Sequence, residues 1–149
     1  MAIYRKKSGK RLVNSIVTEY KGIKFKSRLE KEMFTLLENE GIPFKYEPES
    51  YVVFPSFFFS NKSYERQANG KGYFTNRGFK IVSSISYKPD FVGENFFIET
   101  KGRRTEDFNL RFKLFKRFVK ENCPVETTIY MPQTLTECKE VVELIKKKK

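Results

Sequence analysis

The stretch PDFVGENFFIETKG, residues 89–102, decides the fold of this chain. It holds two short apolar runs separated by Gly93-Glu94-Asn95, a combination of residues that favours a tight turn. We therefore predict that a strand from Phe79 to Tyr87 ends at Lys88-Pro89-Asp90-Phe91-Val92, and that a second strand covers residues 96–101. Gly102 ends the second strand.

The second strand places its side chains alternately on two faces. Phe97, Glu99 and Lys101 share one face, whereas Phe96, Ile98 and Thr100 share the other. The tight turn brings Asp90, which ends the preceding strand, beside Glu99. The sequence thus predicts two carboxylates and one lysine at the end of an otherwise apolar sheet.

Two neighbouring carboxylates at such a place are electrostatically costly, unless a pKa rises or a divalent cation lies between them. Ligands that are all oxygen favour Mg²⁺ or Mn²⁺. The carbonyl of Thr100 is a further candidate ligand. Lys101 beside such an ion is placed to orient or deprotonate a water and to stabilise charge on phosphorus, as metal-assisted phosphodiester hydrolysis requires.

Helical and strand patterns surround this stretch. Leu29, Met33, Leu36 and Leu37 form an apolar stripe from an N-cap at Ser27 to a stop at Gly41, with Glu30 beside the stripe. We further predict a strand over residues 44–54, an inserted hairpin or loop over 56–80, a helix over 105–123, a strand over 126–131 and a helix over 134–145. This order predicts a single α/β domain in which helices flank a mixed β-sheet.

Composition narrows the function further. The chain has 149 residues, with 30 Lys and Arg against 18 Asp and Glu, which gives a net charge of +12. Such an excess indicates a polyanionic partner, with an anionic membrane surface or a solubilising bias as alternatives. The chain has no His and only two cysteines, Cys123 and Cys138. These counts exclude His-dependent triads and make structural zinc unlikely; we expect both thiols to be buried or half-buried.

The two ends are basic. We predict a basic N-terminal arm over residues 1–17, a nuclease domain over 18–145, and a basic tail over 146–149. No stretch is long and apolar enough to span a membrane, and no apolar signal core is present. We expect an intracellular, cytoplasmic protein.

The motifs together resemble a known superfamily. Pro89-Asp90, eight intervening residues and Glu99-Thr100-Lys101 resemble the PD-(D/E)xK signature of nucleases, and Ser27-Arg28-Leu29-Glu30 is similar to the first-helix motif of that superfamily. The region from residue 18 to 120 resembles small phage-encoded nucleases and phage junction-resolving endonucleases. The resemblance implies a restriction-endonuclease-like core and Mg²⁺ dependence, with Mn²⁺ able to substitute. It implies that Asp90 and Glu99 bind metal, that Glu30 does so directly or through water, and that Lys101 is catalytic.

On this basis we expect an endodeoxyribonuclease that cuts branched DNA such as a four-way (Holliday) junction during recombination, and that acts as a homodimer. One alternative is a nicking or structure-nonspecific DNA endonuclease. Another is a DNA-binding accessory protein with a vestigial site. Candidate phosphate contacts, each weighed against a merely solvated surface, are Arg103, Arg104, Arg111, Lys113, Lys116 and Arg117.

Two further expectations concern aromatic and acidic residues. Phe57, Phe58 and Phe59 are expected to pack in the core or in the hairpin, with base stacking as the alternative. Glu47 is a further candidate for a position near the metal.

Overall fold

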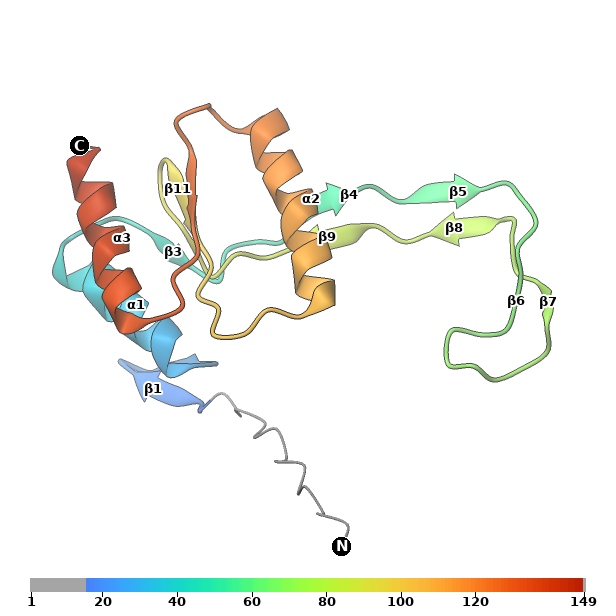
Figure 1. The fold of residues 1–149 in the computed structure, drawn as a ribbon, viewed down its shortest axis with the longest axis horizontal. Helices are drawn as coiled ribbons and strands as arrows, with labels where there is room; N and C mark the ends of the chain where they lie inside the picture. The colour runs from blue at the N-terminus through green and yellow to red at the C-terminus, as the bar shows by residue number, and fades with distance from the viewer. Residues whose placement is uncertain (1–15, 149) are drawn as a thin grey trace, which may run out of the picture.

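The computed structural model describes residues 16–148, which form three helices joined by short strands. The helices are α1 (Arg28–Asn39), α2 (Glu106–Asn122) and α3 (Leu135–Lys147). Figure 1 shows the three helices gathered around a central sheet, with a long ribbon that extends away from them. Residues 1–15 and Lys149, and with them most of the predicted N-terminal arm, lie outside the described residues.

The central sheet has four strands in the order β12-β11-β10-β3. β10 (Phe91–Val92) pairs antiparallel with both β11 (Phe96–Ile98) and β3 (Lys45–Tyr46), whereas β11 pairs parallel with β12 (Thr128–Tyr130). The parallel pair is joined by α2, as a crossover connection requires. The predicted mixed sheet with flanking helices in one domain is confirmed.

The two faces of this sheet carry separate cores. One core holds Phe91, Phe96 and Ile98 of the sheet, which pack with residues of α1 and α3. The other holds Phe97 together with the apolar face of α2. The residues that α2 buries are Phe108, Phe112, Phe115 and Val119. Phe96 and Phe97 therefore point to opposite faces, as the alternation along the strand predicts.

The helix ends follow the capping signals in the sequence. The hydroxyls of Ser27, Thr105 and Thr134 accept hydrogen bonds from the third residue of α1, α2 and α3, respectively. Gly41 has a φ of +63°, the left-handed conformation that commonly follows a helix. These caps fix the direction of α1, and with it the place of Glu30 in its first turn.

The ribbon consists of three successive antiparallel pairs. β4 (Tyr51–Phe54) pairs with β9 (Ile85–Tyr87), then β5 (Phe57–Phe59) with β8 (Lys80–Val82), and finally β6 (Tyr64–Glu65) with β7 (Thr75–Asn76). The first pair packs on α2, whereas the other two extend beyond the domain (Figure 1). A separate hairpin of β1 (Thr18–Tyr20) and β2 (Ile23–Phe25) precedes α1.

Several predicted boundaries are wrong. Residues 44–54 are not one strand, because Glu47 has a φ of +46° and Pro48 follows it, so β3 and β4 belong to different sheets. The strand predicted from Phe79 is broken between β8 and β9. Helix α3 continues beyond the predicted end at residue 145 and includes Lys146, whose ammonium pairs with Glu40 at 2.9 Å.

The aromatic run on β5 lies in the ribbon, which is the hairpin alternative of the expectation, and not in the core. Phe57 and Phe58 are 44% and 59% exposed, and Phe57 packs edge-on against Phe54 within the ribbon. Both cysteines are free; Cys138 is buried and Cys123 is half-buried, as predicted. Among residues 16–148, no helix is long and apolar enough to cross a membrane.

Candidate active site

Asp90 and Glu99 flank the end of the β10–β11 hairpin, each one residue beyond the last paired residues, Phe91 and Ile98. The register pairs Phe91 with Ile98 and Val92 with Phe97, so the next residues in line are Asp90 and Glu99. The backbone of Glu99 remains paired, since its N–H donates to the carbonyl of Tyr130 at 2.9 Å. The two carboxylates are therefore placed by the sheet itself.

The turn that sets this register depends on Gly93. The Gly93 N–H donates to the Phe96 carbonyl at 2.9 Å, which closes the hairpin around Glu94 and Asn95. A Cβ at Gly93 would lie 2.1 Å from the ring of Phe96. A side chain at position 93 would clash with Phe96, so the tight turn requires glycine there. This turn determines the register of the hairpin, and thus the positions of Asp90 and Glu99.

Burial makes the ionised forms of both acids costly. Glu99 is only 8% exposed, and its burial, together with the negative charge of Asp90, raises its pKa well above the ordinary range. Burial also raises the pKa of Asp90, against the lowering effect of its hydrogen bonds from Thr100. A site that holds two such carboxylates is matched to a bound positive charge.

Thr100 fixes the side chain of Asp90. Its backbone N–H and its hydroxyl both donate to Oδ2 of Asp90, each at 2.7 Å. Oδ2 therefore has two donors, whereas no donor reaches Oδ1 within the described residues. Asp90 is thus held in one orientation with one oxygen left to bind a ligand.

Glu30 comes to the same site from α1. It is 6% exposed, and its Oε2 accepts hydrogen bonds from the Tyr46 hydroxyl at 2.8 Å and from the Lys26 N–H at 3.2 Å. Its charge contributes to the raised pKa of both Asp90 and Glu99. Three carboxylates from two elements therefore influence one another electrostatically.

Lys101 lies two residues after Glu99, in the segment that follows β11, because the strand predicted over residues 96–101 ends at Ile98. Its N–H donates to the Pro132 carbonyl at 3.1 Å, which continues the pairing with the chain that follows β12. Its Nζ lies 4.4 Å from the ring centre of Phe108 on α2. Its positive charge lowers the pKa of Glu99. The lysine is thus within electrostatic reach of the carboxylates.

Two further groups border the site. Lys26 forms an ion pair with Glu47, and its charge acts on Asp90. The Glu47 N–H donates to the Asp90 carbonyl at 2.8 Å. Glu47 therefore lies beside the site, although its own carboxylate is occupied by Lys26.

Tyr87 places a buried hydroxyl at the same site. Its ring stacks on Phe115 with centroids 4.4 Å apart, and the residue is only 6% exposed. The hydroxyl lowers the pKa of Glu99, because it stabilises the ionised carboxylate. Within the described residues, however, none of its contacts has the geometry of a hydrogen bond. Burial of the ring, with the nearby charges of Glu99 and Asp90, raises the pKa of Tyr87 far above the ordinary range. The Tyr87 hydroxyl is therefore a further polar group that acts on the charge of Glu99.

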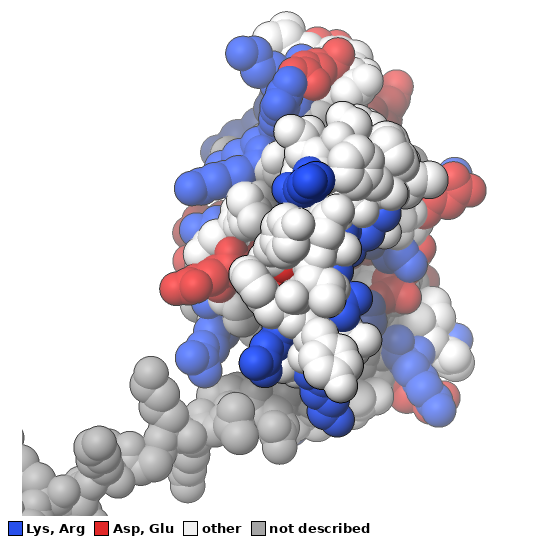
Figure 2. Space-filling model, turned by 90° about the vertical axis from the view of Figure 1, so that its right-hand side faces the viewer, with Lys and Arg blue, Asp and Glu red and all other residues white. Residues whose placement is uncertain are grey.

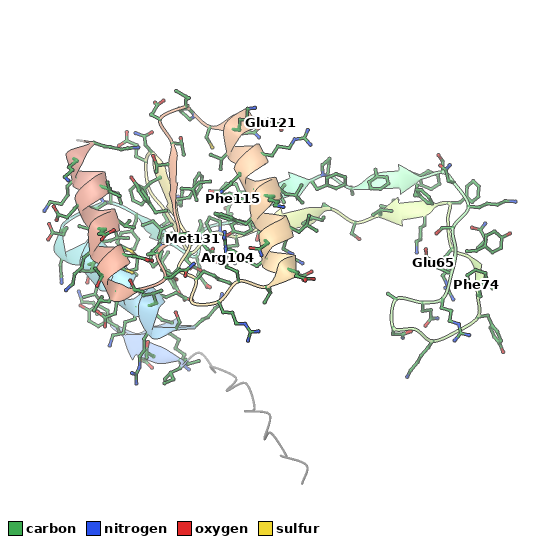
Figure 3. All side chains as sticks on the ribbon, in the orientation of Figure 1. Glu65, Phe74, Arg104, Phe115, Glu121 and Met131 are labelled. Carbon is green, nitrogen blue, oxygen red and sulfur yellow. The ribbon has the colours of Figure 1, made fainter. Side chains whose placement is uncertain are left out.

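The predicted basic contacts differ in their surroundings. Arg104 lies over the rings of Phe108 and Phe112, at 5.9 and 5.7 Å, on the side of α2 that faces the sheet (Figure 3). Arg117 is engaged in an ion pair with Glu121 at 2.8 Å. Like Arg104 and Arg117, the other four candidates are exposed: Arg103, Arg111, Lys113 and Lys116. Of these four, Lys116 also lies over the ring of Phe112.

Among residues 16–148, no three Asp, Glu, Cys or His side chains are arranged to hold a metal ion. The oxygens of Glu30 accept hydrogen bonds from Ser27, Lys26 and Tyr46. The pair of Asp90 and Glu99 nevertheless fits a Mg²⁺ ion, which typically keeps several waters and takes one or two carboxylates. Glu30 fits a role through water better than a direct one.

Comparisons with known proteins give no independent support for a family. No family model, no curated protein and no solved structure matches this chain.

The sequence named Asp90, Glu99, Lys101 and Glu30 as candidate site residues, and the structure brings these four residues together at one end of the sheet. The sequence analysis did not name Tyr46, Lys26 and Tyr87, which contact or act on the same carboxylates. Tyr87 precedes Pro89-Asp90 closely in the sequence, but a tyrosine in an aromatic-rich chain gives no signal of its own. Only the packing against Phe115 shows where its hydroxyl lies.

Proposed function

We propose that this chain is a Mg²⁺-dependent nuclease that hydrolyses phosphodiester bonds in DNA. The observation that carries the proposal is the placing of Asp90 and Glu99 just beyond the last pair of the β10–β11 hairpin, where both are buried with raised pKa values and where Lys101 follows two residues after Glu99. Buried acids without a matching cation destabilise a fold, so their presence here favours a function that uses them.

Asp90, Glu99 and the carbonyl of Thr100 would hold the ion, with Glu30 acting through a water. Bound Mg²⁺ polarises a phosphoryl oxygen and lowers the pKa of a coordinated water. Thr100 keeps Asp90 in position through its two hydrogen bonds. Lys101, beside Glu99, orients the attacking water and stabilises the negative charge that develops on the phosphate.

Charge supports a nucleic acid as substrate. The net charge of +12 favours a polyanion, and Arg103 and Arg104 come after the Glu99-Thr100-Lys101 motif with only Gly102 between. The choice of DNA, and the narrower proposal that a homodimer cuts branched DNA, rest on the resemblance to phage junction-resolving endonucleases.

The test compares a labelled four-way junction with a linear duplex of matched sequence, in Mg²⁺ and in EDTA. The variants are Glu99→Gln and, as a matched control, Glu94→Gln, an exposed acid in the turn of the same hairpin. We expect Mg²⁺-dependent cutting by wild type and by Glu94→Gln, and loss of at least about a hundredfold in rate for Glu99→Gln, since removal of one transition-state contact typically costs that much.

Each outcome has a distinct meaning. Cutting of the junction alone supports the resolvase proposal, whereas equal cutting of both substrates leaves a nuclease without that preference. Tight binding of DNA with no cutting in Mg²⁺ or Mn²⁺ would contradict the nuclease and favour the accessory DNA-binding protein. Equal activity of wild type and Glu99→Gln would place the active site elsewhere.

A further inference from the structure

The end of the ribbon, residues 60–78, presents aromatic rings to solvent. Tyr64, Phe74 and Tyr73 are 57%, 68% and 85% exposed. Tyr64 and Phe74 lie near each other, with ring centres 6.1 Å apart. Figure 3 shows Phe74 at the far end of the ribbon, remote from α2 and from the candidate active site. We call residues 60–78 the ribbon tip.

The ribbon tip is also basic. It contains Lys62, Arg66, Lys71 and Arg77 against a single acid, Glu65. None of these four basic side chains forms an ion pair with any residue in the part of the chain that the structure describes. Glu65 instead accepts a hydrogen bond from the Ser63 hydroxyl at 2.6 Å. Figure 2, which views the molecule from the side of the ribbon, shows Lys and Arg around an uncharged surface.

The ribbon tip is held by polar contacts rather than by a core. The Asn76 side chain accepts from the N–H groups of Ser63 and Gly78, both at 3.0 Å, and the Arg77 N–H donates to the Ser63 carbonyl at 2.7 Å. A Cβ at Gly78 would lie 1.8 Å from the carbonyl oxygen of Asn61. The exposed rings therefore contribute little to holding this shape, and a role outside the fold must explain them.

From these contacts we propose that the ribbon tip binds DNA with unpaired bases. Tyr73 and Phe74 stack on exposed bases, while Arg66 and Lys71 contact the phosphates that flank them. Aromatic rings among unpaired basic side chains are the combination that single strands require, since every base offers a flat face and every nucleotide a negative charge. In a duplex the base faces are already stacked, so exposed rings find no partner there.

A second copy of this chain fits the ribbon tip less well. Burying the rings against a protein would also remove three exposed cations, Lys62, Arg66 and Lys71, from water, with only one acid per copy to compensate. Protein interfaces exclude charges from their centres for this reason. A nucleic acid strand supplies the compensating charge itself.

The inference rests on the proposed function for its choice of DNA, and it deepens that function by naming unpaired bases as the feature recognised. The nuclease proposal and the proposal for the ribbon tip can each be wrong without the other. Binding by the ribbon tip is measured in EDTA, where no metal-dependent cutting occurs, and it does not involve Glu99 or Asp90.

The experiment measures binding of a fluorescent oligothymidine to the full chain by anisotropy in EDTA, with an unlabelled duplex as competitor. The variants are Tyr73→Leu and Phe74→Leu, which keep apolar volume but remove the ring. Matched controls are Phe74→Tyr, which keeps the ring, and Phe58→Leu, an exposed ring on β5 outside the ribbon tip. Thermal melts check that each variant is folded, and Glu99→Gln serves as a catalytically impaired reference.

We expect each leucine variant to weaken binding roughly tenfold, since loss of one base–aromatic stack has an effect of that order. Both controls are expected to bind as wild type does. Arg66→Gln and Lys71→Gln should each make binding less sensitive to salt, by about 0.7 in the slope of log affinity against log salt concentration.

The opposite results would overturn the proposal. These are unchanged binding by Tyr73→Leu and Phe74→Leu, or equal competition by duplex and single strand. A loss of dimer on sedimentation in these variants, with unchanged affinity for the oligonucleotide, would assign the ribbon tip to a second copy of the chain instead. Loss of cutting without loss of binding in Glu99→Gln would leave this inference intact.

Discussion

Tyr87 has the least ordinary environment of any single residue at the site, because its buried hydroxyl makes no hydrogen bond within residues 16–148. We expect Tyr87→Phe to keep the stacking on Phe115 and to raise the free energy of unfolding in EDTA by about 1 kcal/mol, since an unsatisfied buried hydroxyl is costly. Urea titration checks this. Phe115→Ala is the contrasting change, with an expected loss of about 3–5 kcal/mol. Destabilisation by Tyr87→Phe would show that the hydroxyl has a stabilising partner.

Glu99 makes stability depend on pH. Its pKa is raised by burial in the folded state, so the folded protein holds this proton more tightly than the unfolded chain does. In EDTA the free energy of unfolding therefore falls as the pH rises from about 4.3, the ordinary value for Glu, toward the raised pKa. We expect Glu99→Gln to be more stable than wild type at neutral pH, by on the order of 2 kcal/mol, and equally stable below about pH 4.

Urea unfolding at several pH values in EDTA measures this difference, with the exposed Glu94→Gln as a control that leaves the pH dependence unchanged. A Glu99→Gln variant that is less stable than wild type at every pH would contradict the prediction.

The sequence predicts those site residues whose positions depend on local patterns, and it does not predict those whose positions depend on packing. Asp90, Glu99 and Lys101 are predictable because strand alternation and one tight turn determine which side chains share a face. Glu30 is predictable from its place in the first turn of a capped helix. Tyr87 and Lys26 are close in sequence to Asp90 and Glu30, but their positions depend on contacts with distant segments, the ring of Phe115 and the carboxylate of Glu47, for which a single sequence carries no local signal.

The N-cap of α1 affects both stability and the site. We expect Ser27→Ala and Thr134→Ala each to lower the free energy of unfolding by about 1 kcal/mol, because each removes the hydroxyl that accepts from the first turn of its helix. Only Ser27→Ala should also slow Mg²⁺-dependent cutting, since Ser27 contacts Glu30. Equal effects of the two variants on cutting, at matched stability, would argue against a role for Glu30.

Among the elements, the three helices were predicted well and the strands less so. Apolar stripes with hydroxyl caps define α1, α2 and α3 within about two residues. The run from residue 44 to 54 has strand composition throughout, but Glu47 adopts a positive φ that composition does not reveal. Its two halves thus join different sheets. Strand propensity indicates that a segment is extended, but it gives little information about which strand the segment pairs with.

At the scale of the molecule, the outer ribbon is separable from the domain. Replacing residues 56–83 by a short turn retains β4 and β9, whose Tyr51, Val53 and Tyr87 pack against α2. We expect such a protein to melt within a few degrees of wild type, because the removed segment buries little apolar surface. Its affinity for oligothymidine should fall by about tenfold or more. A collapse of the melting temperature in circular dichroism would show that the ribbon supports the core.

The pairing at the base of the ribbon also bears on how fast the chain folds. Tyr46 of β3 must meet Phe91 of β10 across the whole intervening segment, a closure whose entropic cost grows with the length of free chain. When Tyr51 has paired with Tyr87, only a few residues remain free on each side of the gap. Hairpins form in microseconds, so the ribbon can zip from its own turns before the distant strands meet. Pairing within the ribbon thereby shortens the free chain between β3 and β10. These two strands border the candidate site, and their pairing can then occur early on the folding pathway.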